Sequence, residues 1–249
     1  MYVEGMMRNK NYLLSIREFL EGENSGMLLK EAFCKVDVKR RSKAERMRTD
    51  RGKAACLGAG LLLQLAVREA VGACGDAGRR DMGEEIHSED VLRRFSVSRL
   101  LESISYSIPI SYYYGKNGKP YFQEYPFYFN LSHSGDYVFC ALSSGEVGAD
   151  IQQYCSNDNK RLAERFFSPQ EILALQGCGE GKNALFYRLW ARKEAYGKLT
   201  GEGIAPVIGM NFLPEAAQRA GGRKLVWEEY SEPEGYHLAI CRYDAHSLE

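Results

Sequence analysis

The sequence lacks an excess of charge of either sign. Its 249 residues include 33 Lys and Arg against 33 Asp and Glu, so the formal net charge is zero. A neutral chain has no overall field that attracts nucleic acid or anionic membranes. We therefore expect neither as a partner, and any polyanionic ligand must be held by a local site.

The sequence also lacks a long apolar run. The longest one, residues 54–67, is interrupted by Gln64 and two glycines and is shorter than the roughly 20 residues that span a bilayer. It predicts a buried helix. Residues 1–12 lack the apolar core of a secretory signal, so we expect a cytoplasmic protein.

Closely spaced cysteines are missing as well. The seven cysteines include no C-x-x-C pair and no cluster with histidine, which argues against a zinc site and against a disulfide framework. Reduced, mostly buried thiols are the expectation.

The first half of the chain predicts helices. Residues 12–33 have helix-like apolar spacing, and a basic run over residues 39–53 leads into the buried helix expected at residues 54–67. Glycines and charges dominate residues 68–90, which indicates a poorly packed connection or a surface insertion.

Strand formers then take over. Asn117-Gly118 separates two such segments and is typical of a tight hairpin turn. Residues 127–152 predict three short strands in an antiparallel meander, and residues 224–230 and 236–243 predict two more.

Two further helices have clear end signals. Ser168, Pro169 and Glu171 form the pattern of an N-cap, a first-turn proline and a capping-box acid. A second helix is expected over residues 183–199, with Gly201 as its stop. The fold class is therefore α+β, with a boundary near Pro126.

Two spacings place polar groups on shared faces. Asp150 and Gln152 lie two apart in a predicted strand, so their side chains leave the same face. Trp190, Glu194 and Lys198 lie four apart along the predicted helix and form one stripe. One acid from a strand and one from a helix could bind a hard dication. Taken singly, Glu194 and Lys198 also fit a surface ion pair, and Asp150 fits a strand end at the surface.

Several ordered strings resemble one enzyme family. GADIQ and LWARKEAYGK are similar to the G-x-D-x-E strand and the W-x-x-K-E-[AS]-x-x-K helix of the 4′-phosphopantetheinyl transferases. GKNGKPYF, FNLSHS and FFSPQE resemble segments of the larger, Sfp-type branch. The resemblance extends from about residue 115 to residue 203.

The resemblance implies a fold and a reaction. The fold would be a pseudo-dimer of two related halves, residues 1–126 and 127–249, each an antiparallel sheet packed with helices. The active site would lie in the cleft between the halves, and the protein would be a monomer. The reaction would transfer the 4′-phosphopantetheine arm of coenzyme A to a serine of an apo acyl or peptidyl carrier protein. It would depend on Mg²⁺ and would release adenosine 3′,5′-bisphosphate.

The resemblance also assigns roles to residues. It implies Asp150, Gln152 and Glu194 as metal ligands, with Glu194 and Lys198 in catalysis. Lys198 and four further residues would contact coenzyme A, namely Arg48, Lys119, Ser132 and His133. From local sequence alone, Lys119 also fits a solvated turn lysine, and His133 an ordinary histidine at a strand end.

Glu171 has two readings from the sequence. The resemblance implies a base that takes the serine proton, whereas the local pattern already explains it as a capping-box acid. Both readings stay open at this point.

Gln152 departs from the family pattern, in which Glu is the commoner residue. The loss of one negative charge predicts a weaker metal site that also accepts Mn²⁺. The absence of Glu at position 152 also raises the alternative of a non-catalytic coenzyme A-binding module with the same fold. A Mg²⁺-dependent coenzyme A phosphohydrolase would share the metal and the cations. Fatty-acid, polyketide or nonribosomal peptide synthesis would supply the carrier, if there is one.

Overall fold

The structure is a computed structural model in which two compact units are distinguished. It describes residues 9–72, 92–156, 159–216, 219–220 and 222–244. Unit 1 comprises Met1–Tyr112, Phe122–Pro126 and Leu131–Ser144, and unit 2 comprises Tyr113–Tyr121, Phe127–Asn130 and Gly145–Glu249. Most of the connection predicted at residues 68–90 lies outside the described residues. The expected α+β class is confirmed.

Unit 1 contains a four-stranded sheet. The strands follow the order β2 (Leu92–Phe95), β1 (Lys10–Ser15), β6 (Tyr137–Ser143) and β5 (Tyr128–Ser134). Of β5, residues 131–134 fall within unit 1. β1 runs antiparallel to β6 but parallel to β2. The prediction of a purely antiparallel sheet is therefore wrong for this unit. A long connection separates β1 from β2, and such a connection permits parallel pairing, whereas a two-residue turn does not.

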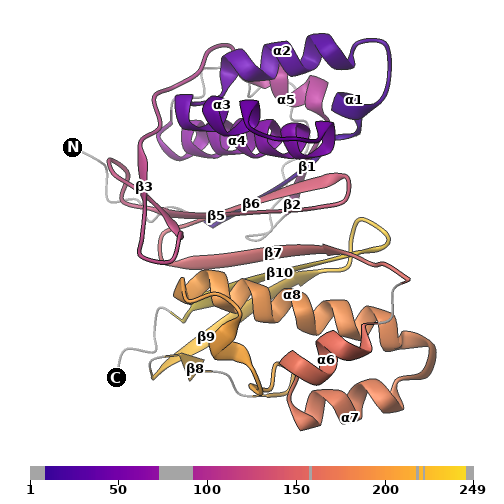
Figure 1. The fold of residues 1–249 in the computed structure, drawn as a ribbon. Coiled ribbons are helices and arrows are strands. Elements are labelled where there is room, and N and C mark those ends of the chain that lie inside the picture. Colours follow the sequence, from indigo (N-terminus) through magenta and orange to yellow (C-terminus); the bar gives the residue numbers. More distant parts are fainter. Residues whose placement is uncertain (1–8, 73–91, 157–158, 217–218, 221, 245–249) are drawn as a thin grey trace. The chain divides into compact units, whose positions relative to one another are not determined.

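The helices of unit 1 lie on one face of this sheet (Figure 1). They are α1 (Arg17–Leu20), α2 (Ser25–Lys35), α3 (Val38–Glu45), α4 (Asp50–Ala70) and α5 (Val97–Ser103). The expected burial of residues 54–67 is confirmed, because α4 is buried throughout this stretch. Within the described parts of the chain, no helix is both long and apolar enough to cross a membrane.

The prediction of helix over residues 12–33 is wrong at its start. Residues 10–15 form strand β1, and the helices begin at Arg17. Tyr12, Leu13 and Leu14 are all buried, so β1 shows no alternation of apolar and polar residues. A strand that is buried on both faces has a continuous apolar run instead of an alternating pattern. Next to a helical segment, such a run is easily taken for the start of the helix.

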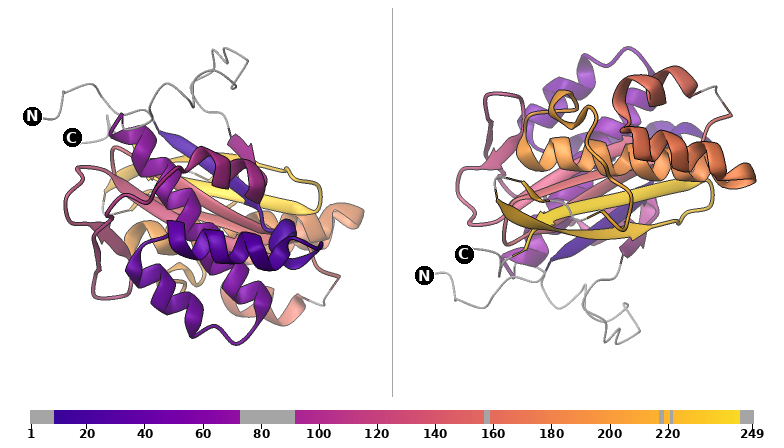
Figure 2. Two further views of the ribbon diagram at one scale, coloured as in Figure 1. Left: turned by 90° about the horizontal axis from the view of Figure 1, so that it is seen from above. Right: turned by 90° about the horizontal axis from the view of Figure 1, so that it is seen from below.

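Unit 2 contains an antiparallel sheet. Its strands follow the order β7 (Val147–Gln153), β10 (Tyr236–Tyr243), β9 (Arg223–Tyr230) and β8 (Arg219–Ala220), and β9 and β10 are the yellow strands of Figure 2. The three strands expected over residues 127–152 are present as β5, β6 and β7, but the predicted meander is wrong. β7 pairs with β10, which lies far along the chain, and belongs to this second sheet.

A hairpin that lies mainly in unit 2 and three α-helices accompany this sheet. The predicted hairpin is formed by β3 (Tyr112–Tyr114) and β4 (Pro120–Phe122), with Gly118 at a φ of 85° in its turn. The helices are α6 (Lys160–Phe166), α7 (Pro169–Gly177) and α8 (Lys182–Thr200). α8 ends at Gly201, whose φ of 72° is left-handed, as the sequence predicts.

Close packing fixes α8 against the sheet. A Cβ atom added to Gly148 on β7 would lie 1.9 Å from the carbonyl oxygen of Ala195 and 2.3 Å from the amide nitrogen of Leu199. Only glycine fits there. The backbone of α8 therefore rests directly on the face of β7 from which Asp150 and Gln152 project, since residues 148, 150 and 152 share one face.

The cysteines that the structure describes are free thiols. Cys56, Cys140 and Cys241 are buried, whereas Cys34, Cys155 and Cys178 are exposed. The prediction of mostly buried cysteines thus holds for half of these six.

Candidate active site

Asp150 lies at the centre of a polar cluster between β7 and α8. It is 3% exposed. Its Oδ1 atom accepts a hydrogen bond of 2.7 Å from the ammonium of Lys198, and its Oδ2 atom accepts one of 2.7 Å from the side-chain amide of Gln152. Both carboxylate oxygens therefore face donors, which keeps the buried charge compensated.

Glu194 is the second acid of this cluster. Burial raises the pKa of its carboxyl above the ordinary value, and the nearby charge of Asp150 raises it further, while Lys198 lowers it. Lys198 also donates to the carbonyl oxygen of Ala149 over 3.1 Å. The strand and the helix thus bring two acids and one cation into electrostatic contact.

The stripe on α8 divides between packing and polar contacts. Trp190 packs against an aromatic group, with ring centroids 5.4 Å from Phe166 and 6.2 Å from Phe186. Glu194 and Lys198, one and two turns further along, lie in the polar cluster. Trp190 therefore helps to anchor the helix that carries both functional candidates.

These donors fit a hard dication. Across the described ranges, no three His, Cys, Asp or Glu side chains are grouped to hold a metal, and the cluster offers two carboxylates and one amide. Mg²⁺ is commonly held by one or two carboxylates, with water and substrate phosphates as the other ligands. Burial, and then the charge of Asp150, raise the pKa of Glu194, and a dication between the two acids would relieve the repulsion between them.

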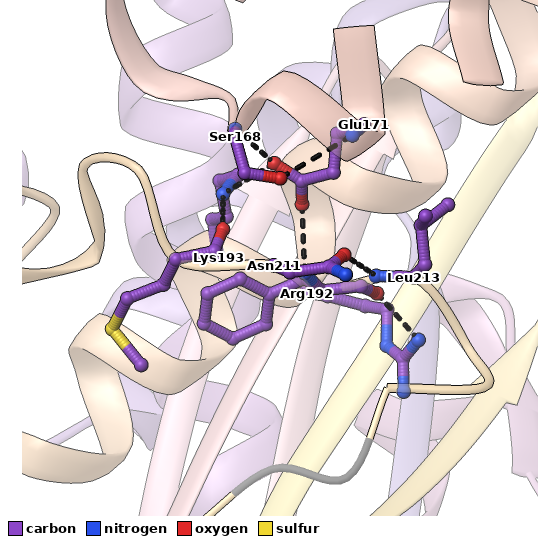
Figure 3. Close-up of polar contacts among 8 residues, drawn as sticks. Ser168, Glu171, Arg192, Lys193, Asn211 and Leu213 are labelled. Carbon is purple, nitrogen blue, oxygen red and sulfur yellow. Dashed lines mark hydrogen bonds and ion pairs between the residues drawn. The ribbon is translucent and has the colours of Figure 1, made fainter. Parts of the chain in front are cut away.

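Glu171 has the structure of a helix cap. The capping box with Ser168 at the start of α7 is complete, as the sequence predicts (Figure 3). The side chain is 0% exposed, and its Oε1 atom accepts from the amide of Phe212 over 2.8 Å. The alternative role as a base stays a prediction, and the burial of both oxygens weighs against it.

Lys119 is buried, and is not a solvated lysine of the hairpin turn. Its ammonium donates to the carbonyl oxygen of Leu199 near the end of α8 and lies 3.5 Å from Glu146. Burial lowers the pKa of Lys119, against the opposing effect of Glu146. The solvated reading is therefore wrong. The ammonium supports the C-terminal turn of the helix that carries Lys198.

The other predicted coenzyme A contacts belong to unit 1. Arg48 is exposed and directly precedes Thr49, the N-cap of α4. Ser132 is buried and His133 is exposed, and both lie on β5. Their grouping with Asp150 and Glu194 of unit 2 stays a prediction.

A second polar group beside the sheet was not predicted from the sequence. Glu229 on β9 accepts two hydrogen bonds from Arg188 of α8, at 3.0 and 2.8 Å, and lies 2.9 Å from the Nε2 atom of His237. His237 is the cross-strand partner of Gln152. Its position inside an apolar strand was the available signal, but its partner depends on strand register.

Comparison with known proteins gives a consistent result. A family model described as the 4′-phosphopantetheinyl transferase superfamily matches residues 146–241. These residues include β7, α8 and β9, and therefore the whole cluster around Asp150.

Curated relatives agree with this match. The chain is 38% identical over 178 residues to a putative 4′-phosphopantetheinyl transferase of Synechocystis, covering 63% of this chain and 71% of that protein. It is 38% identical over 136 residues to the 4′-phosphopantetheinyl transferase psf-1 of Bacillus pumilus, covering 50% of this chain and 57% of that protein. It is 34% identical over 146 residues to a 4′-phosphopantetheinyl transferase of Bacillus subtilis, covering 53% of this chain and 62% of that protein. The chain thus spans about three fifths of the length of the two Bacillus relatives.

Proposed function

This chain belongs to the 4′-phosphopantetheinyl transferase superfamily, and we propose that it modifies carrier proteins. It transfers the 4′-phosphopantetheine arm of coenzyme A to a serine of an apo acyl or peptidyl carrier protein and releases adenosine 3′,5′-bisphosphate. The observation that carries this proposal is the cluster of Asp150, Gln152, Glu194 and Lys198 between β7 and α8.

In the proposed reaction, the serine oxygen forms a bond to the phosphorus that carries the pantetheine arm. The bond from this phosphorus to the bridging oxygen of the pyrophosphate breaks, and the adenosine bisphosphate leaves with that oxygen. The serine proton passes to solvent in this proposal, because Glu171 is enclosed in the core and the carboxylate of Glu194 would be occupied by the metal.

Asp150, Glu194 and the carbonyl oxygen of Gln152 would hold Mg²⁺ in this proposal. When bound, the ion would neutralise charge on the pyrophosphate. The side chain of Lys198 is 28% exposed, and its ammonium would then pair with a phosphate oxygen instead of with Asp150.

The fold would place the substrate between the two halves, residues 1–126 and 127–249. Arg48 of the first half, together with Ser132 and His133 near the start of the second half, would bind the phosphates of coenzyme A. For Lys119 we propose a supporting role, because its ammonium is already bonded to the end of α8.

One assay tests the proposal. The protein is incubated with coenzyme A, Mg²⁺ and an apo acyl or apo peptidyl carrier protein, and the carrier is weighed by mass spectrometry. We expect a mass increase of one phosphopantetheine arm. Asp150→Ala should abolish this increase, whereas Glu164→Ala, on the exposed face of α6, should leave it intact.

The other outcomes favour other functions. Cleavage of coenzyme A without a heavier carrier would support a phosphohydrolase. Binding of coenzyme A with neither product would support a non-catalytic binding module.

A further inference from the structure

A charged pair lies in the core of unit 2 and involves the helix that carries Glu194. The Nζ atom of Lys193 on α8 is 2.9 Å from the Oε2 atom of Glu171 on α7, and both side chains are 0% exposed. Lys193 directly precedes Glu194 in the sequence. Figure 3 shows the two side chains meeting between their helices.

Each partner also holds backbone groups. Glu171 accepts hydrogen bonds from the amides of Ser168, over 2.6 Å, and Phe212, over 2.8 Å. Lys193 donates to the carbonyl oxygen of Met210 over 2.6 Å. The pair therefore joins three segments, which are the start of α7, the middle of α8 and residues 210–212.

A neighbouring cation strengthens the third of these links. Arg192 donates to the carbonyl oxygen of Phe212 over 2.7 Å, and its guanidinium lies 4.5 Å from the ring centre of Trp227. Residues 210–212 are thus bonded to two consecutive side chains of α8. Lys193 leaves α8 on a side other than the one that rests on Gly148, because residues 193 and 195 lie on nearly opposite sides of a helix.

Stability alone does not account for a pair of this kind. The desolvation of two buried charges is so costly that apolar residues of similar volume often stabilise a core equally well. A hydrogen-bonded pair constrains geometry, because an ammonium that is bonded to both a carboxylate and a carbonyl oxygen is fixed in position. Apolar side chains can shift against one another without losing their contacts. The contacts of Lys193 therefore limit how far α8 can turn about its axis.

We propose that Glu171 and Lys193 are positioning residues for Glu194. The pair and the close contact at Gly148 grip α8 from two sides, and together they fix the rotation of the helix that brings Glu194 beside Asp150. This inference rests on the proposed function, in which Glu194 binds the metal. In this inference Glu171 does not touch the substrate or take the serine proton.

The test uses the full-length protein with three variants. Glu171→Gln keeps a capping-box acceptor but removes the charge, and Lys193→Met keeps the side-chain length. The double variant contains both changes. Glu164→Gln breaks the exposed pair with Lys160 and is the matched control.

Three quantities are measured for each protein. They are the melting temperature, the dissociation constant of Mn²⁺ by electron paramagnetic resonance without substrates, and the turnover number for carrier modification. We expect each single variant to weaken Mn²⁺ binding and to lower turnover, both at least tenfold. The control should change none of the three.

The double variant separates positioning from stability. It contains no unpaired buried charge, so its melting temperature should recover above that of either single variant. Its Mn²⁺ binding and turnover should stay as low as in the single variants, because the anchor of α8 is still missing. Recovery of Mn²⁺ binding together with the melting temperature would mean that the pair only stabilises the core, and would overturn the inference.

Two other results would also overturn it. Unchanged Mn²⁺ binding with a large loss of turnover in Glu171→Gln would make Glu171 a group that acts on the substrate. A wild-type protein that binds no Mn²⁺ would leave Glu194 with no metal to bind. If the wild type binds Mn²⁺ but modifies no carrier, the proposed function fails while the Mn²⁺ measurements still decide the inference.

Discussion

Gln152 tunes the charge of the cluster at the scale of a single residue. Its amide donates to Asp150 over 2.7 Å, so in the absence of metal it offsets part of the negative charge beside Glu194. A carboxylate at this position would reverse that effect. It would repel Asp150 without metal and attract a dication with metal.

We therefore expect Gln152→Glu to have opposite effects with and without Mg²⁺. The variant should melt at a lower temperature than the wild type in a chelator, and its half-saturating Mg²⁺ concentration should fall by roughly tenfold, the effect of about 1.4 kcal/mol. Thermal unfolding and an activity titration measure the two effects. Gln153→Glu adds the same charge on the opposite face of β7 and should not tighten Mg²⁺ binding. An unchanged Mg²⁺ requirement in Gln152→Glu would argue against Gln152 as a ligand.

Lys119 offers a test that separates support of α8 from substrate binding. Lys119→Met removes a buried charged donor from the carbonyl oxygen of Leu199 and should lower the free energy of unfolding by about 1 to 2 kcal/mol. Denaturant unfolding measures this loss, and the KM for coenzyme A should change less than threefold. Lys116→Met, in the exposed part of the same turn, should change neither value. A large rise in KM at unchanged stability would restore Lys119 as a phosphate contact.

At the scale of elements, the contact between α8 and β7 is the closest one that supports the site. Gly148→Ala would push a methyl group into the backbone of α8, so the helix must move away from the sheet. We expect a loss of about 3 kcal/mol in the free energy of unfolding, and weaker Mn²⁺ binding because Glu194 moves with the helix. Gly145→Ala, whose added Cβ atom meets nothing within 4 Å, should be neutral. Equal stability of the two variants would contradict the packing described here.

The link between α8, β9 and β10 depends on pH. Burial alone would raise the pKa of Glu229, but the hydrogen bonds from His237 and Arg188 and the nearby charge of Arg192 lower it from 4.5 to about 2. The folded state therefore gains stability above pH 4.5, and this gain is lost as the pH falls toward 2. Partial solvent screening limits it to about 2 kcal/mol.

Glu229→Gln should accordingly be less stable than the wild type by about 2 kcal/mol at pH 7, and more than half of this difference should be gone at pH 3. Urea unfolding at the two pH values measures it. Glu234→Gln, in the exposed turn before β10, serves as the control. A difference that does not depend on pH would contradict the low pKa.

Local signals explain which elements could be predicted from the sequence. The capping box at Ser168, the turn at Asn117-Gly118 and the stop at Gly201 each depend on residues within a few positions of one another, and all three are present. Strand β1 was missed, because burial on both faces hides its period. The partners of β1 and β7 were missed because pairing between distant segments depends on tertiary packing, which no short window of sequence contains.

At the scale of the whole molecule, the site also divides into features that local spacing predicts and features that depend on distant partners. The spacing of Asp150 with Gln152, and of Glu194 with Lys198, predicted two shared faces, and the structure brings these faces together between β7 and α8. The partners of Glu171 and Lys119 could not be predicted. Met210, Phe212 and Leu199 contribute backbone groups, and a backbone group leaves no mark on the sequence.

The proposed binding of coenzyme A by residues of both units makes a prediction for the whole chain. If the phosphates of coenzyme A are bound by Arg48, Ser132 and His133 while Mg²⁺ is held by Asp150 and Glu194, the complete ligand must protect both units from amide hydrogen exchange. Mg²⁺ alone should slow exchange only in β7 and α8 of unit 2. Coenzyme A with Mg²⁺ should also slow exchange in β5 and at the start of α4, because binding suppresses the local opening of every segment that it contacts. Mass spectrometry of exchanged peptides measures this, with Asp150→Ala as the control that should lose the Mg²⁺ effect. Protection confined to unit 2 in the presence of both ligands would contradict substrate binding by residues of both units, and would leave the metal cluster of unit 2 as the whole binding site.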